Sequence, residues 1–291
     1  MIGPLGKSDI RQSWPESASL APGVNRLKAS SREDFVRETA ANFDDDESFA
    51  RERWNAAVRM LVHDEMNGLP EDWDHNTQMA STRTRAAWLL TPRELFIPES
   101  HRQLAYRSAA LPLSDGQTIS APYMVTRMTA ALNPKPEHRV LEVGTGSGYQ
   151  AAMLAVLSPH VYTVEYVGSL ATRADTLFAR LAGTRSWIGR IRRKVGSGYQ
   201  GWEEGAPYHR IMITCAIDHI PPALIEQLAP EGLIILPLGP PGAQRLLAVR
   251  RAENAVADGL KKSSTSKKPQ QLEFLDVYGD GTRVMFVPFV H

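Results

Sequence analysis

The sequence predicts an α/β protein with a doubly wound, mostly parallel sheet, an antiparallel C-terminal edge and an N-terminal helical extension. Two observations predict this fold class. Short apolar runs alternate with helical segments through the middle of the chain, and three further apolar runs near the C-terminus have no helix between them. Strands separated by helices pair in parallel under two helical layers, whereas strands that follow one another directly tend to pair antiparallel.

The expected elements follow from this pattern in chain order. A helical stripe at 122–132, which Pro134 and Pro136 end, precedes the sheet. Four apolar runs are the expected parallel strands: 139–143, 161–164, 210–214 and 233–238. Helices are expected between and after them at 150–157, 170–181 and 222–228. The antiparallel edge is expected from 244–250, 272–277 and 283–290, and the polar stretch 252–271 is expected to be a flexible loop.

Residues 1–85 are predicted to be an N-terminal tail and helical extension, and residues 86–291 the main domain. The first 30 residues are rich in Ser, Pro, Gly and Ala and are expected to be a tail. The charge-dense stretch 31–68 has apolar residues at helical spacing, namely Trp54, Val58, Leu61 and Val62. We expect one or two helices docked on the main body and, because charge-rich helices are mostly solvated, a solvated helical appendage.

Composition excludes several classes of protein. The 33 Lys+Arg and 32 Asp+Glu residues nearly balance, so the chain lacks the excess positive charge that is typical of nucleic-acid-binding proteins. There is no apolar run of about 18 residues, the length of a transmembrane helix, and the first residues lack the apolar segment of a secretory signal. The lone Cys215 excludes an intramolecular disulfide. We therefore expect a cytoplasmic protein without membrane or nucleic-acid partners.

Three further residue groups are expected to be structural. The eight histidines are scattered without the spacing of a metal site, so no metal is predicted. Cys215 lies inside an apolar run and is expected to pack in the core rather than act as a nucleophile. The basic groups at 190–194 and 261–268 lack interleaved aromatic residues and are expected to be solvated surface.

The segment with chemical information is a glycine-rich turn between a predicted strand and a predicted helix, Val140-Leu-Glu-Val-Gly-Thr-Gly-Ser-Gly-Tyr-Gln150. Glycines allow a positive φ and let a ligand lie against the backbone. The turn is not a P-loop, because no Lys-Ser/Thr pair follows. It also departs from the dinucleotide fingerprint, because the third glycine comes one residue early.

Two acids sharpen the interpretation of this turn. Glu142 lies near the end of the first strand, and Glu165 ends the next strand about 20 residues after the glycines. A carboxylate at a strand end can accept hydrogen bonds from both hydroxyls of a ribose, and the turn has no Lys or Arg for a phosphate. A ribose-bearing cofactor without phosphates, S-adenosylmethionine, fits best.

The sequence resembles the protein-L-isoaspartate O-methyltransferases, a family of class I S-adenosylmethionine-dependent enzymes, over residues 88–250 and more loosely through 290. The strings that carry the resemblance are 91–98 (TPRELFIP), 116–122 (GQTISAP), 140–150, 196–202 (GSGYQGW), 218–221 (DHIP), 236–239 (LPLG) and 284–288 (VMFVP). The Gly-Gln-Thr-Ile-Ser string is the most specific, because generic adenosylmethionine enzymes lack it. The resemblance implies a Rossmann-like methyltransferase fold and repair methylation of L-isoaspartyl residues in proteins or peptides.

The resemblance also implies a set of site residues. Ser120 matches the family's active-site serine, with Thr118 beside it at the substrate carboxylate; from the sequence alone, Ser120 could instead cap the helix that follows. The implied cofactor-binding residues are Glu142, Gly144, Thr145, Gly146, Gly148, Glu165, Tyr166, Gly196, Ser197 and Gly198. Two departures stand out: Ser197 replaces the acid that the family has between two glycines, and Tyr208-His-Arg210 replaces a Tyr-Asp pair.

The chemistry of carboxylate methylation agrees with these residues. A carboxylate is already ionised near pH 7, so no general base is required. Two alternatives stay open. The long N-terminal extension favours a methyltransferase dedicated to an aspartyl carboxylate of one modified peptide or partner. Ser197 favours an S-adenosylmethionine-binding protein with little catalysis.

Overall fold

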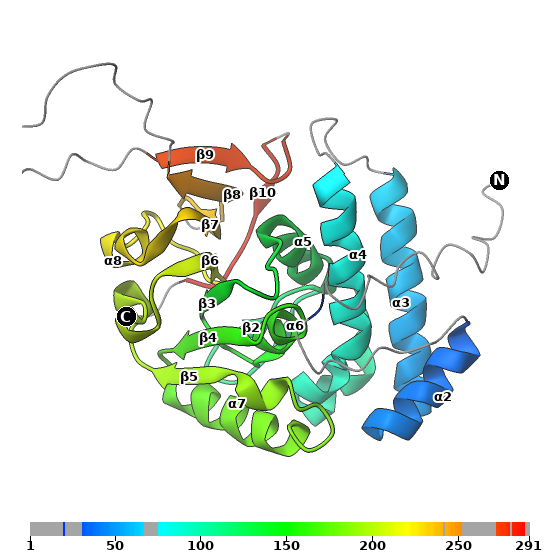
Figure 1. Ribbon diagram of the computed structural model, residues 1–291. Helices are drawn as coiled ribbons and strands as arrows, with labels where there is room; N and C mark the ends of the chain where they lie inside the picture. Colours follow the sequence, from blue (N-terminus) through cyan, green and yellow to red (C-terminus); the bar gives the residue numbers. More distant parts are fainter. Residues whose placement is uncertain are drawn as a thin grey trace, which may run out of the picture.

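The computed structural model describes residues 20, 31–66, 75–240, 242–251, 272–279 and 281–288. An eight-stranded sheet forms its centre, with helices packed around it (Figure 1). The strands are β3 (Arg139–Val143), β4 (His160–Glu165), β5 (Arg192–Val195), β6 (Tyr208–Ile213), β7 (Leu228–Leu238), β8 (Gln244–Arg251), β9 (Leu272–Asp276) and β10 (Arg283–Val284). Their order across the sheet is β10-β8-β7-β6-β3-β4-β5, and β9 pairs with β8.

Strand directions confirm the predicted fold class. β5, β4, β3, β6 and β7 pair in parallel. β8 runs antiparallel to β7, and both β9 and β10 run antiparallel to β8. β4 and β5 follow β3 towards one edge of the sheet, and the chain then returns to the other side of β3, where β6 and β7 lie. The strand order therefore reverses between β3 and β6. In sheets of this kind, ligands bind beyond the carboxyl ends of the strands at that reversal.

Helices lie between the strands close to where the sequence predicts them. They are α5 (Pro122–Leu132), α6 (Tyr149–Leu157), α7 (Gly168–Leu181) and α8 (Pro222–Glu226). All nine residues of α6 are buried. The two faces of the sheet carry separate apolar clusters, because side chains alternate along a strand: Val140 of β3 belongs to one cluster and its neighbour Leu141 to the other.

Several elements were not predicted. β5 carries the basic group at 190–194, and its charged residues stay largely exposed because β5 is the edge of the sheet. The helix α4 (His75–Leu90) is polar over most of its length and has no regular apolar stripe. A two-stranded ribbon of β1 (Leu111–Pro112) and β2 (Thr118–Ile119) precedes α5. The last predicted strand is shorter than expected, since only Arg283–Val284 pairs as a strand.

The N-terminal helices α2 (Arg32–Phe43) and α3 (Glu47–Met66) are not the solvated appendage that the sequence suggests. Phe35, Phe43 and Trp54 are buried in the same apolar cluster as residues of the main body. The charge density that suggested solvation reflects one exposed face, while the aromatic side chains face inward. The two helices are docked on the main body, as expected, but as a buried layer and not as a solvated appendage.

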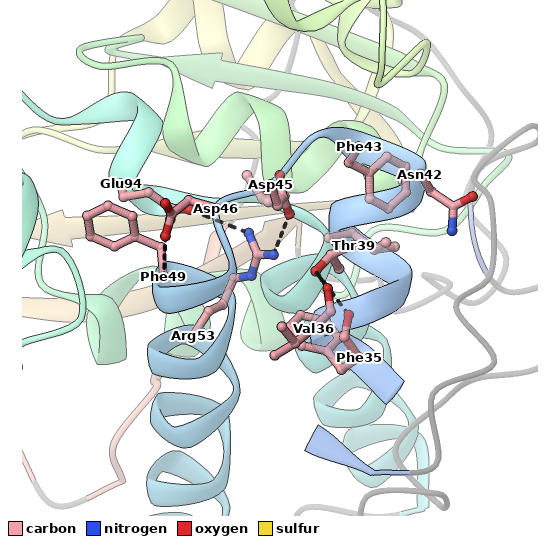
Figure 2. A network of polar contacts seen from close by, with 12 residues as sticks. Phe35, Val36, Thr39, Asn42, Phe43, Asp45, Asp46, Phe49, Arg53 and Glu94 are labelled. Atoms are coloured by element: carbon pink, nitrogen blue, oxygen red, sulfur yellow. Dashed lines mark hydrogen bonds and ion pairs between the residues drawn. The ribbon is translucent and has the colours of Figure 1, made fainter. Parts of the chain in front are cut away.

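A buried charge cluster ties these helices to the rest of the fold (Figure 2). Asp45, between α2 and α3, pairs with Arg53 at 2.6 Å and also with Arg185, which lies 140 residues further on. Arg53 also lies 3.9 Å from Glu94. The side chains of all four residues are at most 3% exposed.

Two predictions about the N-terminal region stay predictions. The boundary at residue 85 falls within α4. The tail at 1–30 lies outside the described residues except for Leu20, which is buried. The loop predicted at 252–271 also lies outside them.

Within the described ranges, no helix is long and apolar enough to cross a membrane, and no group of His, Cys, Asp and Glu is arranged to hold a metal ion.

Candidate active site

The glycine-rich turn between β3 and α6 has the geometry that requires glycine. Gly144 and Gly148 have φ values of 97° and 84°. A Cβ atom at Gly144 would lie 2.5 Å from the hydroxyl oxygen of Thr214, and one at Gly148 would lie 2.6 Å from the ring of Phe178. Both positions therefore exclude a side chain through backbone conformation and through space.

A pocket with about 560 Å³ of empty space lies beyond the carboxyl ends of β3, β4 and β6. Six predicted site residues line it: Thr118, Gly144, Gly146, Glu165, Tyr166 and Gly198. They come from β2, the glycine turn, the end of β4 and the loop after β5. The fold thus brings together residues from four separate segments at the reversal of strand order.

Glu165 is held in a fixed orientation at the edge of this pocket. Its Oε2 accepts the N–H of Gly146 at 2.7 Å, and its Oε1 accepts the N–H of Val167 at 2.8 Å. The residue is only 7% exposed. Each carboxylate oxygen can accept a second hydrogen bond, so Glu165 can still bind the two hydroxyls of a ribose.

The composition of the pocket fits an adenosylmethionine-type ligand. Among the described residues that line it, none is Lys or Arg, so nothing there complements a phosphate. A Cβ atom added to Gly146 would meet no atom within 4 Å, so this turn leaves open space beside its backbone.

Glu142 lies behind the turn, and it is not among the described residues that line the pocket. It is fully buried and accepts a hydrogen bond from the hydroxyl of Thr163 at 2.5 Å. That hydroxyl is also 2.6 Å from the hydroxyl of Thr145. Burial raises the pKa of Glu142 to about 8. Glu142 and Thr145 therefore support the turn, and Gly148 begins α6 as its N-cap residue.

The two residues predicted to lie at the substrate carboxylate, Thr118 and Ser120, have different positions relative to the pocket. Thr118 is exposed on β2 and lines the pocket, whereas Ser120 is half-buried and is not among the described lining residues. The N-cap of α5 is Ala121 and not Ser120. The alternative that Ser120 caps this helix therefore has no support in the structure.

The loop after β5 shows what Ser197 does in place of an acid. Its hydroxyl oxygen accepts the N–H of Tyr199 at 3.3 Å and caps a short 3-10 turn, Gly198–Gln200. Gly196 donates its N–H to the backbone oxygen of Glu165 at 2.9 Å, and Gly198 lines the pocket. Of the three cofactor-binding residues predicted in this loop, Gly196, Ser197 and Gly198, only Gly198 lines the pocket.

The second departure from the family pattern lies far from the pocket. Tyr208, His209 and Arg210 begin β6, whereas the pocket residue Thr214 follows the end of that strand. His209 stacks on His138, with ring centroids 5.3 Å apart. Arg210 donates to the backbone oxygen of Leu132 at 2.8 Å. These residues contact the amino-terminal end of the sheet.

Sequence reasoning missed part of the pocket wall. The additional wall residues are Gln117, Val143, Val164, Val167, Leu170, Thr214, Cys215, Val287 and Pro288. Cys215, which was expected to pack in the core, is half-buried directly after β6, where it contacts both an apolar cluster and the pocket. Burial raises the pKa of its thiol to about 12, which disfavours the thiolate that a nucleophile requires.

Comparison with known proteins gives one consistent result. Residues 65–266 match the family model described as protein-L-isoaspartate(D-aspartate) O-methyltransferase. The chain is 48% identical over 174 residues to a protein-L-isoaspartate O-methyltransferase of Halorhodospira halophila, an alignment that covers 60% of this chain and 77% of that protein. It is 40% identical over 191 residues to a second such protein from Nitrosococcus oceani, covering 66% and 84%.

Solved structures show the same fold. A Plasmodium falciparum protein described as a putative protein-L-isoaspartate O-methyltransferase in complex with S-adenosyl-L-homocysteine aligns with a TM-score of 0.56. The two chains are 21% identical, and the alignment covers 80% of this chain and 97% of that one. From the length and identity of these matches, the chain belongs to the protein-L-isoaspartate O-methyltransferase family.

Proposed function

We propose that this enzyme binds S-adenosylmethionine at Glu165 and the glycine turn, and the carboxylate of an L-isoaspartyl residue at Thr118 and Ser120. Membership of the family makes it a methyltransferase that uses S-adenosylmethionine and acts in isoaspartate repair. The observation that carries the assignment of Thr118 and Glu165 is the shared pocket, which brings β2 and the end of β4 to one cavity. Ser120 is assigned because it matches the active-site serine of the family.

The pocket residues suit methyl transfer to a carboxylate. The cofactor, when bound, supplies a methyl group activated by the adjacent sulfonium. Thr118 has a hydroxyl that can donate to the substrate carboxylate without competing strongly as a nucleophile. Val143, Val164 and Leu170 give the pocket apolar walls, which reduce the contact of a bound ligand with water. The enzyme therefore contributes mainly alignment and desolvation.

Neither alternative gains support from the structure. The case for a single dedicated partner rested on an N-terminal extension free to recruit it, but the aromatic side chains of α2 and α3 are buried in the core. The case for weak catalysis rested on Ser197, whose hydroxyl caps its own turn while Gly198 lines the pocket. Repair of isoaspartyl peptides or proteins is thus the function that the site supports best. The proposed location is the cytoplasm, in agreement with the single cysteine.

The decisive experiment measures methyl incorporation into a short isoaspartyl peptide and into its aspartyl twin. Incorporation only into the isoaspartyl peptide is expected. Incorporation into the aspartyl twin alone, or into neither peptide despite measurable adenosylmethionine binding, would contradict the proposal.

A substitution at Ser120 tests the acceptor assignment. Ser120→Ala should lower kcat about tenfold, which corresponds to about 1.4 kcal/mol of barrier. Its melting temperature and its affinity for adenosylmethionine should stay close to those of the wild type. The matched control is Ser108→Ala, an exposed serine outside the described pocket walls, which should behave as wild type. Normal turnover by Ser120→Ala would remove Ser120 from the site.

A further inference from the structure

The C-terminal part of the chain returns to the pocket and forms one of its walls. After β10, Val287 and Pro288 line the cavity beside Thr214 and Cys215. The N–H of Ala216, which follows β6, donates to the backbone oxygen of Val287 at 2.8 Å. This wall is therefore built from a segment that is not part of the parallel sheet, and its position depends on a few contacts.

Gln244 supplies one of those contacts from a fully buried position at the start of β8. Its Oε1 accepts the N–H of Phe286 at 3.3 Å, and its Nε2 donates to the backbone oxygen of Pro240 at 2.9 Å. The backbone pairing between β8 and β10 ends at Gln244 opposite Val284. The side-chain amide thus extends the ladder by one bond, next to the pocket wall.

A second buried glutamine, Gln227, makes the same kind of bridge to the loop that follows β5. Oε1 of Gln227 accepts the N–H of Trp202 at 2.9 Å, and its Nε2 donates to the backbone oxygen of Gln200 at 2.8 Å. These contacts hold the loop that contains the wall residue Gly198. The chain therefore offers a matched pair of amides, one behind each of two walls.

The two walls lie on opposite flanks of the site. Glu165 ends β4, and Gly198 follows β5, the edge strand on that side. Val287 instead lies beside Ala216 after β6, on the other side of β3. With the ribose at Glu165, the β4–β5 flank holds the nucleoside. The β6 flank is the part of the pocket on the far side of β3 from Glu165, and Thr118 lines the same cavity.

We propose that Gln244 is a positioning residue for the acceptor carboxylate, because it fixes the segment whose Val287 and Pro288 form the acceptor-side wall. The inference rests on the proposed function, since it takes the acceptor to be a peptide carboxylate. Gln227 is the corresponding residue on the cofactor side. The wall at Val287 then affects how the peptide is bound and leaves the affinity for the cofactor nearly unchanged.

The test compares Gln244→Met with Gln227→Met, which remove both hydrogen bonds of each amide and keep a side chain of similar length. Gln244→Met should raise KM for the isoaspartyl peptide about fivefold, which is the scale for losing one neutral hydrogen bond. The Kd for adenosylmethionine should change less than about twofold. Gln227→Met should show the reverse pattern. Equal changes in both constants for both variants, or an unchanged peptide KM in Gln244→Met, would overturn the proposal.

Hydrogen exchange provides a readout that does not depend on activity. In Gln244→Met, amides in 283–288 should exchange faster than in the wild type, while those in 198–202 should not. Unchanged exchange in 283–288 would show that Gln244 does not fix this segment. That result would refute the proposal even if the enzyme proved to have another substrate. If Gln244→Met does not fold, Val287→Ala trims the same wall directly and should give the same rise in peptide KM. An unchanged KM in Val287→Ala would refute the assignment of the wall.

Discussion

Replacing Asp45 with Asn tests whether the N-terminal helices are part of one cooperative fold. Asp45 is the anion between two buried guanidiniums, those of Arg53 and Arg185, and its side chain is 1% exposed. Asn keeps the shape but removes the charge, so both cations remain buried with less compensation. Removing one partner of a buried ion pair typically costs about 3–5 kcal/mol, a large part of the roughly 5–15 kcal/mol by which proteins are stable.

The neighbouring Asp46 provides a matched control. It is exposed, and its Oδ1 accepts the N–H groups of Ser48 and Phe49 at the start of α3. Asp46→Asn keeps an acceptor oxygen at that position, so we expect a loss below about 1 kcal/mol, the usual scale for a helix cap. The same chemical change at adjacent positions should therefore have very different effects.

Urea unfolding, followed by far-UV circular dichroism and by tryptophan fluorescence, measures both variants. The wild type should unfold in a single transition with both probes, because α2, α3 and the main body share an apolar cluster. Asp45→Asn should shift the midpoint strongly without changing the slope m. If Asp45→Asn costs no more than Asp46→Asn, the charge cluster does not attach these helices.

Three further predictions concern the cofactor site and pH. Glu165→Ala should weaken adenosylmethionine binding by about 1–3 kcal/mol, as measured by calorimetry. An unchanged Kd would mean that the ribose does not bind at Glu165. Ser197→Asp should tighten adenosylmethionine binding, because an aspartate can keep the cap on the N–H of Tyr199 and restore the acid of the family; weaker binding would show that the loop is arranged differently. Desolvation and the nearby Arg210 lower the pKa of His138 to about 3. Since an unfolded histidine titrates near 6.5, the unfolded state binds more protons between these values. The free energy of unfolding should therefore fall as the pH drops from about 7 towards 3, and His138→Gln should flatten that slope in acid titrations.

Much of the fold could be predicted because its strands carry their own signal. The β3, β4, β6 and β7 runs are apolar on both faces, as buried parallel strands require, and glycines or helical stripes separate them. The edge strand β5 has no such signal, because its residues Arg192 and Arg193 are charged and exposed. The burial of α2 and α3 was equally hard to foresee, because the partner of Asp45 that joins them to the main body, Arg185, is remote in sequence.

The site was predictable where it depends on local backbone geometry. The positive φ values of Gly144 and Gly148 are properties of a tight turn, and a sequence with alternating glycines indicates them directly. Val287 and Pro288 reach the pocket through long-range contacts: Val287 bonds to Ala216, and the neighbouring Phe286 bonds to Gln244. The string 284–288 carries part of the family resemblance, but no periodicity shows that it reaches the pocket, since that depends on where β8 begins relative to the end of β6.

The string 91–98 has a structural explanation, although none of its residues is among the described residues that line the pocket. Tyr149 directly follows the last glycine of the turn, and its ring packs edge-on against Trp88 and Phe96, with centroids 6.1 and 5.5 Å apart. The guanidinium carbon of Arg93 lies 5.3 Å from the centre of the same ring. These residues hold the first turn of α6 from behind, so the segment before the catalytic sheet fixes the end of the glycine turn that faces away from the ligand. Residues 88–96 therefore support the glycine turn through the ring of Tyr149. The two strings therefore belong to one structural unit, although 41 residues (99–139) separate them in the sequence.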